Sequence, residues 1–263
     1  MDHEFKKQFG QNFLENFPKI IEICDIADIQ EGENIIEIGP GDGAFTEEIL
    51  NRKANLLAIE IDPSLVSYLK DKFTQYKNFQ IIENDILQIN PSTLNPNKKY
   101  KLLSALPYNI SKKIINQFLT STNPPTTMTL IMQKEVAEDY TNTKKGQIKF
   151  LHILAKTYSK DVEYFGAIRK EDFYPEPKVD GGIVKFSYVN TQIPDPESFL
   201  KFVKLGFSAP RKKLSSNLSN IYKDKKDEVE KILAKLNLSK DSRAGELQFV
   251  DWYKLYKNFT NAR

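Results

Sequence analysis

The sequence predicts an α/β protein with a mostly parallel sheet, followed by a small all-helical C-terminal domain. Short apolar runs alternate with helical patterns over the first two-thirds of the chain, which is typical of βα units and of parallel strand pairing. A glycine-rich stretch at 39–43 follows the first apolar run and opens a helix, and beyond residue 198 only helical periods are found. With 263 residues, the chain is long enough for one large domain and a smaller one.

The elements of the first domain follow from caps, turns and apolar runs, taken in chain order. Asn16 and Pro18 predict a helix start, because Asn is a favoured N-cap and Pro fits the first turn, and this helix runs to about Ile29. Short aliphatic runs bounded by turn residues predict buried strands, at 35–38, 56–61, 79–82, 101–105, 127–132, 162–168 and 183–188. The glycine-rich stretch leads into a helix that runs through Leu50. Helical patterns predict further helices over 62–76, 111–119, with Ser111 as its cap, and 147–158.

A Pro-rich, polar segment at Thr191–Ser198 is the best candidate for a linker. It divides the chain into a first domain, 1–190, and a second domain, 191–263. The second domain is expected to hold helices near 198–206, 211–222, 226–236 and 248–258.

The composition excludes several classes of protein. Hydrophobic residues make up 40% and charged residues 28%, as in ordinary soluble domains. No apolar run approaches the roughly 20 residues that span a bilayer, and the first residues lack the apolar segment of a secretory signal. Cys24 is the single cysteine, so no internal disulfide can form, which fits the cytoplasm. With only His3 and His152 besides, we expect no metal site.

The charge is unevenly distributed along the chain. Residues 191–263 carry 15 Lys and Arg against 9 Asp and Glu, whereas the remaining residues carry 23 against 26. A basic tail on a neutral to acidic body indicates a polyanion-binding appendage. A solvated helical surface explains the same counts equally well.

The strongest local signal for a ligand is the stretch Glu37–Gly43, placed after a strand and opening a helix. Glycines there permit a tight turn and a close approach of backbone N–H groups to a ligand. Glu60 and Asp85 follow the next two strands, where a carboxylate can accept hydrogen bonds from ribose hydroxyls or an adenine amine. Such a turn can bind NAD or S-adenosylmethionine, or bind nothing. Its G-x-G-x-G spacing differs from the dinucleotide pattern G-x-G-x-x-G and favours S-adenosylmethionine.

After the fourth strand comes Ala105–Ile110, and here the sequence resembles the ribosomal RNA adenine dimethyltransferases, with the macrolide-resistance methyltransferases as a closely similar group. The resemblance covers essentially the whole chain. It rests on ordered matches at Phe9–Leu14, Glu37–Gly43, Glu60–Asp62, Asn84-Asp85, Leu106–Ser111, Met132–Ala137, Phe173–Gly181, Phe207, Arg211–Leu214 and Asn217-Leu218. The opening Phe-Gly-Gln-Asn-Phe-Leu and the Pro-x-Pro-x-Val stretch favour the dimethyltransferase branch.

The resemblance implies a class I S-adenosylmethionine-dependent methyltransferase (Rossmann-like) domain with a small all-helical C-terminal RNA-binding domain. It implies S-adenosyl-L-methionine as cofactor, held by Asn12, Leu14, Gly39, Gly41, Glu60, Ile61, Asp85, Ile86 and Ala105. The catalytic motif is Ala105, Leu106, Pro107 and Tyr108. The implied partners are small-subunit rRNA and the immature small ribosomal subunit, with the enzyme acting as a monomer and without a metal or a membrane.

The chemistry of an adenine amine explains such a motif. The amine lends its lone pair to the ring and is a poor nucleophile, so hydrogen-bond acceptors on its N–H groups must aim the lone pair at the methyl sulfonium. An Asn side chain and the backbone carbonyl at the Leu-Pro position supply these acceptors in the family pattern, and Pro107 cannot compete as a donor because it lacks an N–H. Tyr108 offers a face for the flipped base. Positioning therefore accounts for most of the rate.

Position 105 departs from the family pattern, which has Asn where this chain has Ala. Loss of one acceptor is expected to cost roughly 1–3 kcal/mol, or about 5- to 150-fold in rate. Three explanations remain open: a substitution that weakens catalysis, a naturally slow or RNA-binding protein, or replacement of the acceptor by Asn109 or a water.

Two further segments are candidates for RNA contacts. Phe173 begins an aromatic, proline-rich stretch, and the resemblance favours stacking on the flipped adenine opposite Tyr108 over a hydrophobic plug. Arg211, Lys212 and Lys213 cluster at the start of a predicted helix and suit a phosphate backbone, although a solvated helix start has the same composition. Lys6 and Lys7 could extend the same RNA face, although a frayed basic terminus explains them too.

The leading functional hypothesis is an rRNA adenine N6,N6-dimethyltransferase that modifies two adjacent adenines near the 3' end of small-subunit rRNA. The alternatives are a non-catalytic ribosome assembly factor, which Ala105 favours, and a large-subunit rRNA methyltransferase that confers macrolide resistance. A nicotinamide-dependent dehydrogenase is the fourth functional hypothesis.

Overall fold

The computed structural model describes residues 12–95, 98–142, 148–189, 193–219 and 226–261. The chain divides into two compact units, residues 1–141 with 158–190, and residues 142–157 with 191–263. The division differs from the predicted one at 142–157, because Ile148 and Ile153 are buried in the core of the C-terminal helices. Phe9–Gln11 of the opening motif and Lys6-Lys7 lie outside the described residues.

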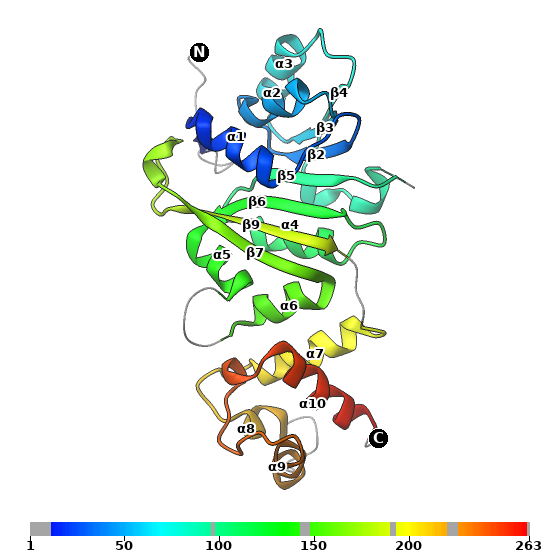
Figure 1. Cartoon of the computed structure of the whole chain (residues 1–263), viewed down its shortest axis with the longest axis vertical. Coiled ribbons are helices and arrows are strands. Elements are labelled where there is room, and N and C mark those ends of the chain that lie inside the picture. The colour runs from blue at the N-terminus through cyan, green and yellow to red at the C-terminus, as the bar shows by residue number, and fades with distance from the viewer. Residues whose placement is uncertain (1–11, 96–97, 143–147, 190–192, 220–225, 262–263) are drawn as a thin grey trace. The chain divides into compact units, whose positions relative to one another are not determined.

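The first unit is built on a seven-stranded sheet of order β4-β3-β2-β5-β6-β9-β7, whose central strands lie side by side in Figure 1. Neighbouring strands from β4 to β6 are parallel, whereas β9 pairs antiparallel with both β6 and β7. The strands are β2 (Asn34–Ile38), β3 (Asn55–Glu60), β4 (Phe79–Glu83), β5 (Lys101–Ala105), β6 (Thr127–Gln133), β7 (Ser159–Ile168) and β9 (Gly181–Val189). A separate two-stranded ribbon pairs β1 (Phe13–Leu14) with β8 (Phe173–Tyr174). All seven predicted strands are confirmed within a few residues.

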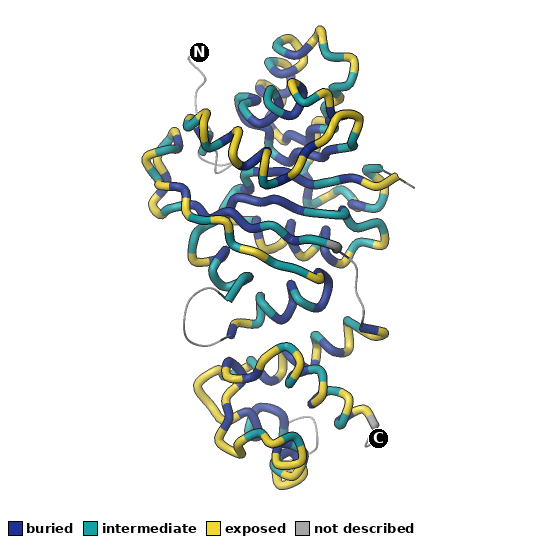
Figure 2. Tube along the Cα trace, in the orientation of Figure 1, coloured by how far each residue is buried: buried dark blue, intermediate teal, exposed yellow. Residues whose placement is uncertain are grey.

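Helices cover both faces of this sheet. They are α1 (Phe17–Ile26), α2 (Ala44–Asn51), α3 (Pro63–Lys72), α4 (Ser111–Leu119) and α5 (Lys134–Thr141). Successive side chains of β9 point to opposite faces of the sheet. On one face, Lys185 Nζ donates to the carbonyl of Ile26 at the end of α1, 2.6 Å away. On the other face, the ring of Phe186 packs edge-on against Tyr140 of α5. The central strands are consequently buried along most of their length (Figure 2).

The sequence missed three elements and misplaced one cap. The strands β1 and β8 are only two residues long, too short for a period to be read, and α5 follows β6 without an intervening turn. Asn16 is confirmed as the N-cap of α1, where its side chain accepts from the N–H of Lys19. Ser111 is not a cap: it is the first residue of α4, and its hydroxyl donates to the Tyr108 carbonyl.

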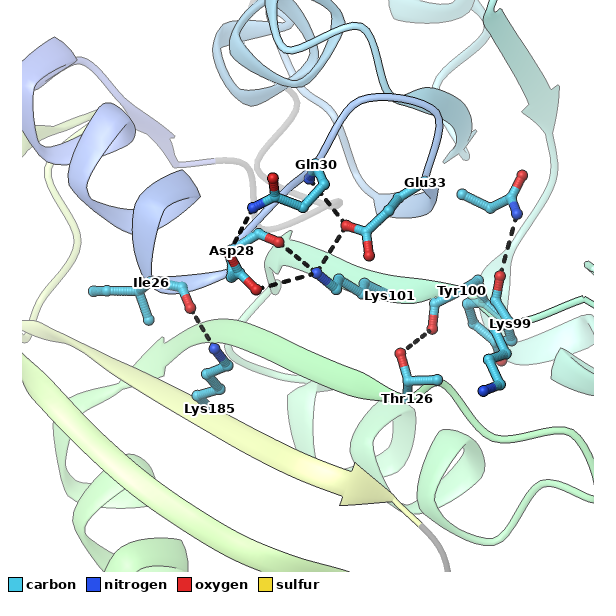
Figure 3. A network of polar contacts seen from close by, with 10 residues as sticks. Ile26, Asp28, Gln30, Glu33, Lys99, Tyr100, Lys101, Thr126 and Lys185 are labelled. Atoms are coloured by element: carbon cyan, nitrogen blue, oxygen red, sulfur yellow. Dashed lines mark hydrogen bonds and ion pairs between the residues drawn. The ribbon is translucent and has the colours of Figure 1, made fainter.

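A polar network holds the loop after α1 against the edge of the sheet where β5 begins (Figure 3). Lys101 Nζ lies 2.7 Å from a carboxylate oxygen of Glu33 and also donates to the carbonyl of Asp28. Because β5 begins at Lys101 and ends at Ala105, this network stands at the opposite edge of the sheet from the strand ends described below. It therefore anchors the scaffold rather than forming part of the site.

The second unit contains α6 (Phe150–Tyr158), α7 (Pro196–Gly206), α8 (Leu214–Leu218), α9 (Lys226–Lys235) and α10 (Phe249–Asn261). Aromatic rings around the buried Trp252 form much of its core, with Phe207 stacked on the indole at 5.4 Å between centroids. The predicted linker was too long, because Asp195 caps α7 and Pro196 begins it. The helix predicted over 211–222 is described only from Leu214 to Leu218. Within the part of the chain that is described, no helix is long and apolar enough to cross a membrane.

Candidate active site

A pocket of about 250 Å³ opens at the carboxyl ends of β2, β3 and β5. In parallel sheets this edge is where ligands bind. Every residue predicted to bind the cofactor or to form the catalytic motif lines this pocket, together with Phe173: Asn12, Leu14, Gly39, Gly41, Glu60, Ile61, Asp85, Ile86, Ala105, Leu106, Pro107 and Tyr108. Residues more than 150 positions apart in the chain are thereby brought together, while their individual roles stay predictions.

The glycine-rich turn has a backbone that only glycine adopts easily. Gly39, Gly41 and Gly43 have φ values of +63°, +61° and +87°. A Cβ at Gly39 would meet no atom within 4 Å, so the backbone there borders open space, as a ligand cradle requires. A Cβ at Gly41 would lie 2.6 Å from the ring of Phe13, which already packs on this turn. The turn can therefore admit a ligand close to its backbone beside Gly39.

Two carboxylates beside the turn are held by the local backbone. Glu60 is 5% exposed at the end of β3, and its Oε1 accepts from the N–H groups of Ile61 and Asp62 at 2.8 and 2.9 Å. Asp85 Oδ1 accepts from the N–H of Leu87 at 2.9 Å, just after β4. One oxygen of each group is thus fixed by the chain, so both carboxylates are oriented before a ligand arrives.

Acidic side chains gather around this part of the pocket, where a nearby cation would stabilise their ionised forms. Burial raises the pKa of Glu60 and of Asp42. Glu37 is buried, and burial raises its pKa to about 8, with further contributions from Asp42 and Glu60. Thr46 Oγ1 donates to Glu37 at 2.6 Å and opposes that shift. Such a setting favours a cationic ligand over an anionic one. S-adenosylmethionine, which carries a sulfonium and an ammonium group, fits these residues better than the pyrophosphate of NAD.

The turn after β5 places the motif that contains Ala105. The N–H of Leu106 donates to the carbonyl of Ile131 at 3.0 Å, which ties the turn to β6. The Pro107 carbonyl accepts from the N–H groups of Ile110 and Ser111 at the start of α4. Because the Pro107 carbonyl already serves α4, the Leu106 carbonyl is the better candidate for contact with a substrate.

Two aromatic side chains approach each other over Gly181. A Cβ at Gly181 would lie 3.3 Å from Cζ of Phe173 and 3.4 Å from the hydroxyl oxygen of Tyr108. The Tyr108 hydroxyl is buried without a hydrogen-bond partner among the described residues, and burial, with the nearby Asp180, raises its pKa to about 12. It therefore stays neutral at physiological pH, and the rings frame the pocket as an apolar clamp for a flat ligand.

The predicted RNA-contacting cations lie in the second unit. Arg211, Lys212 and Lys213 are exposed and directly precede α8. Lys213 is not available as a simple cation, because its ammonium group pairs with Asp241, which raises the pKa of Lys213 and lowers that of Asp241.

Several residues that line the pocket were not assigned to the site by sequence reasoning, among them Phe13, Asp42 and Asn84. Phe13 belongs to the opening motif, but its pairing with β8 could not be read from two residues. Asp42 stands between two glycines, and nothing in the sequence around it indicated that its side chain lines the pocket. Among the described residues, no group of three or more His, Cys, Asp or Glu is arranged to hold a metal ion.

The sequence profile of the family described as "Ribosomal RNA adenine dimethylase" matches residues 2–260. The "Ribosomal RNA small subunit methyltransferase A" of Mycoplasma capricolum is 35% identical over 258 residues, covering 95% of this chain and 96% of the relative. The protein of the same name from Lactococcus lactis is 32% identical, covering 97% and 90%.

Two solved structures share the fold. A dimethyladenosine transferase from Plasmodium falciparum superposes with a TM-score of 0.80 at 23% identity, covering 95% of this chain and 98% of that one. The 23S rRNA methyltransferase ErmE superposes with a TM-score of 0.77, also at 23% identity, covering 94% and 99%. At such identities the likeness establishes the fold, a class I methyltransferase domain followed by helices, and nothing more about the substrate.

Proposed function

The chain belongs to the ribosomal RNA adenine dimethylase family, and on that premise we propose that it dimethylates two adjacent adenines near the 3' end of small-subunit rRNA. The family establishes the coarser statement: the protein is a methyltransferase that uses S-adenosylmethionine and acts on adenine in rRNA. The named relatives support the small subunit as the target. We further propose that it acts as a cytoplasmic monomer on the immature subunit, without a metal.

One observation carries the site assignment: the glycine-rich turn, the Ala105–Tyr108 turn and Phe173 surround a single pocket. We propose that Gly39, Gly41, Glu60 and Asp85 hold the cofactor, with Asn12, Leu14, Ile61, Ile86 and Ala105 completing its contacts. The buried carboxylate of Glu60 suits the ribose hydroxyls, because a carboxylate accepts two hydrogen bonds at once. The carboxylate of Asp42, which lines the pocket, favours the cationic end of the cofactor, because a nearby cation stabilises its ionised form.

Catalysis depends on how the target amine is held. S-adenosylmethionine supplies a methyl group on a positively charged sulfur, which is already activated for transfer. We propose that Tyr108 and Phe173 stack on the flipped adenine while the Leu106 carbonyl accepts one amine N–H. Accepting that hydrogen turns the nitrogen lone pair toward the methyl group. Pro107 presents no N–H that could compete for the amine.

Ala105 removes the second acceptor of the family motif, and this supports the non-catalytic assembly factor as a second candidate. Asn109 lines the same pocket and is exposed, so its amide could accept the second N–H. The two candidates differ in whether any methyl group is transferred.

Labelled methyl transfer to purified RNA substrates tests the proposal. We expect the chain to methylate adenines of immature small subunits slowly, and to leave free large-subunit RNA unlabelled. Transfer to large-subunit RNA alone would instead support the macrolide-resistance activity. Absence of transfer by both the natural chain and Ala105→Asn would support the assembly factor.

The ion pair between Lys213 and Asp241 leads to a prediction about RNA affinity. Asp241 competes with a phosphate for the Lys213 ammonium group. In Asp241→Asn, RNA is therefore expected to bind more tightly, and the slope of log K against log salt should steepen by about one. Fluorescence anisotropy over a salt series measures both quantities. The gain should vanish in Asp241→Asn combined with Lys213→Ala, and an unchanged slope in Asp241→Asn would contradict a phosphate contact at Lys213.

A further inference from the structure

The β1–β8 ribbon joins two parts of the pocket that the proposed function assigns to different ligands. Leu14 of β1, a proposed cofactor contact, is the direct register partner of Phe173 of β8, a proposed base contact. Both side chains are buried, at 4% and 5% exposure, and both line the pocket. Directly opposed residues in an antiparallel pair have Cβ atoms only about 5 Å apart, so one cannot shift without the other.

The other residue of β1 rests on the cofactor turn. The ring of Phe13 lies 2.6 Å from the position of a Cβ at Gly41. Phe13 is in turn the register partner of Tyr174. The short strand β1 is thus held between the glycine-rich turn on one side and β8 on the other. The glycine-rich turn therefore contacts β1 through Phe13, and β1 contacts Phe173 through Leu14.

A side-chain clamp fastens this ribbon at its end. Asn16 Nδ2 donates to Asp172 Oδ1 at 2.8 Å, between residues 156 positions apart. The N–H of Glu15 donates to the carbonyl of Asp172 at 2.9 Å. The amide oxygen of Asn16 meanwhile accepts from the N–H of Lys19 and caps α1. The clamp therefore needs a side chain that donates and accepts at once, which an amide does and a carboxylate does not.

We propose that Asn16 and Asp172 are positioning residues that make the β1–β8 ribbon a link between the two ligands, so that the methyl donor and the target base bind cooperatively. The inference rests on the proposed function, since it assigns the two ends of the ribbon to those ligands. Neither residue lines the pocket, so any effect on binding is transmitted through the ribbon. Coupling between two ligands is reciprocal: the donor tightens RNA binding by the factor by which RNA tightens donor binding.

Exchange of the two side chains gives a matched set of variants. Asn16→Asp keeps a good helix cap but places two carboxylates in contact, with no donor between them. Asp172→Asn keeps an amide oxygen that can still accept from Asn16 Nδ2, so it serves as the matched single-variant control. In the double variant the amide at position 172 donates to the carboxylate at position 16, so the hydrogen bond between the two side chains reforms. The same carboxylate can also accept from the N–H of Lys19 and cap α1. Thermal melting of all four proteins shows which of them are equally folded.

The first measurement is the affinity for a small-subunit RNA fragment with and without S-adenosylhomocysteine, a non-reacting cofactor product. In the wild type the affinity should rise about tenfold with the cofactor product. In Asn16→Asp that factor should fall toward one, whereas Asp172→Asn should keep it and the double variant should regain it. A wild type without coupling overturns the inference, as does an Asn16→Asp variant that keeps it or a folded double variant that does not regain it.

A second measurement needs no RNA. S-adenosylhomocysteine alone should slow hydrogen exchange in the segment 169–176 of the wild type, of Asp172→Asn and of the double variant, and leave it unchanged in Asn16→Asp. Unslowed exchange in the wild type would overturn the link. Methyl transfer by the wild type is recorded in parallel: its absence would contradict the proposed function, whereas transfer without coupling contradicts only the link.

Discussion

Ala105→Asn is expected to raise the rate of methyl transfer by about 5- to 150-fold, since one hydrogen bond to the target amine is worth roughly 1–3 kcal/mol in the transition state. Ala105 ends β5, is only partly buried and borders the pocket, so a larger side chain can extend into open space. The amide would add an acceptor opposite the Leu106 carbonyl. The expected gain is in kcat, with little change in the KM for the methyl donor, because the new bond is made to the amine.

Single-turnover methyl transfer to immature small subunits measures this gain directly. Ala105→Leu is the matched control, because it fills a similar volume without an acceptor and should not accelerate transfer. Asn109→Ala should slow the natural chain more than it slows Ala105→Asn if the Asn109 amide supplies the second acceptor at present. Equal rates for the Asn, Leu and natural chains would show that position 105 does not contact the amine.

The sequence was informative wherever the chemistry depends on a local pattern. Three glycines between a strand and a helix predicted the cradle, and the structure gives all three a positive φ. Glu60 could be placed at a strand end because β3 reads clearly as a buried run. The parallel sheet then brings Glu60, Asp85 and Ala105 to one edge, which is why the pocket residues of these strands could be predicted together.

The rest depends on contacts that no local pattern contains. The pairing of Leu14 with Phe173 joins two-residue strands far apart in the chain, and nothing in either strand marks its partner. The grouping of α6 with the C-terminal helices likewise follows from which core buries Ile148 and Ile153. The cluster Arg211–Lys213 is plain in the sequence, but its pairing with Asp241 is not. The ion pair between Lys213 and Asp241 means that one of the three cations is already neutralised by a carboxylate.

The buried Glu37 predicts a pH-dependent stability of the first unit. Burial raises the pKa of Glu37 to about 8 from an ordinary value of 4.5. Below pH 4.5 the carboxyl group is protonated in both the folded and the unfolded chain, so it does not change the free energy of unfolding. Between these pH values the folded chain keeps a proton that the unfolded chain releases. Stability therefore falls as pH rises, by about 1.4 kcal/mol per unit and by roughly 4–5 kcal/mol in all, and levels off above the folded pKa.

Glu37→Gln should remove most of this loss, because a neutral amide can still accept from Thr46 Oγ1 and needs no proton. Denaturant unfolding followed by circular dichroism from pH 5 to pH 9 should show a shallower decline for Glu37→Gln than for the natural chain. Some decline of stability with pH should remain in Glu37→Gln, because burial also raises the pKa of Asp42 and of Glu60. Glu31→Gln makes the same chemical change at an exposed carboxylate, 71% accessible, and should leave the decline intact. Identical declines in the natural chain and Glu37→Gln would mean that Glu37 is ionised in the folded protein, with a counter-charge or water that stabilises it beside the glycine-rich turn.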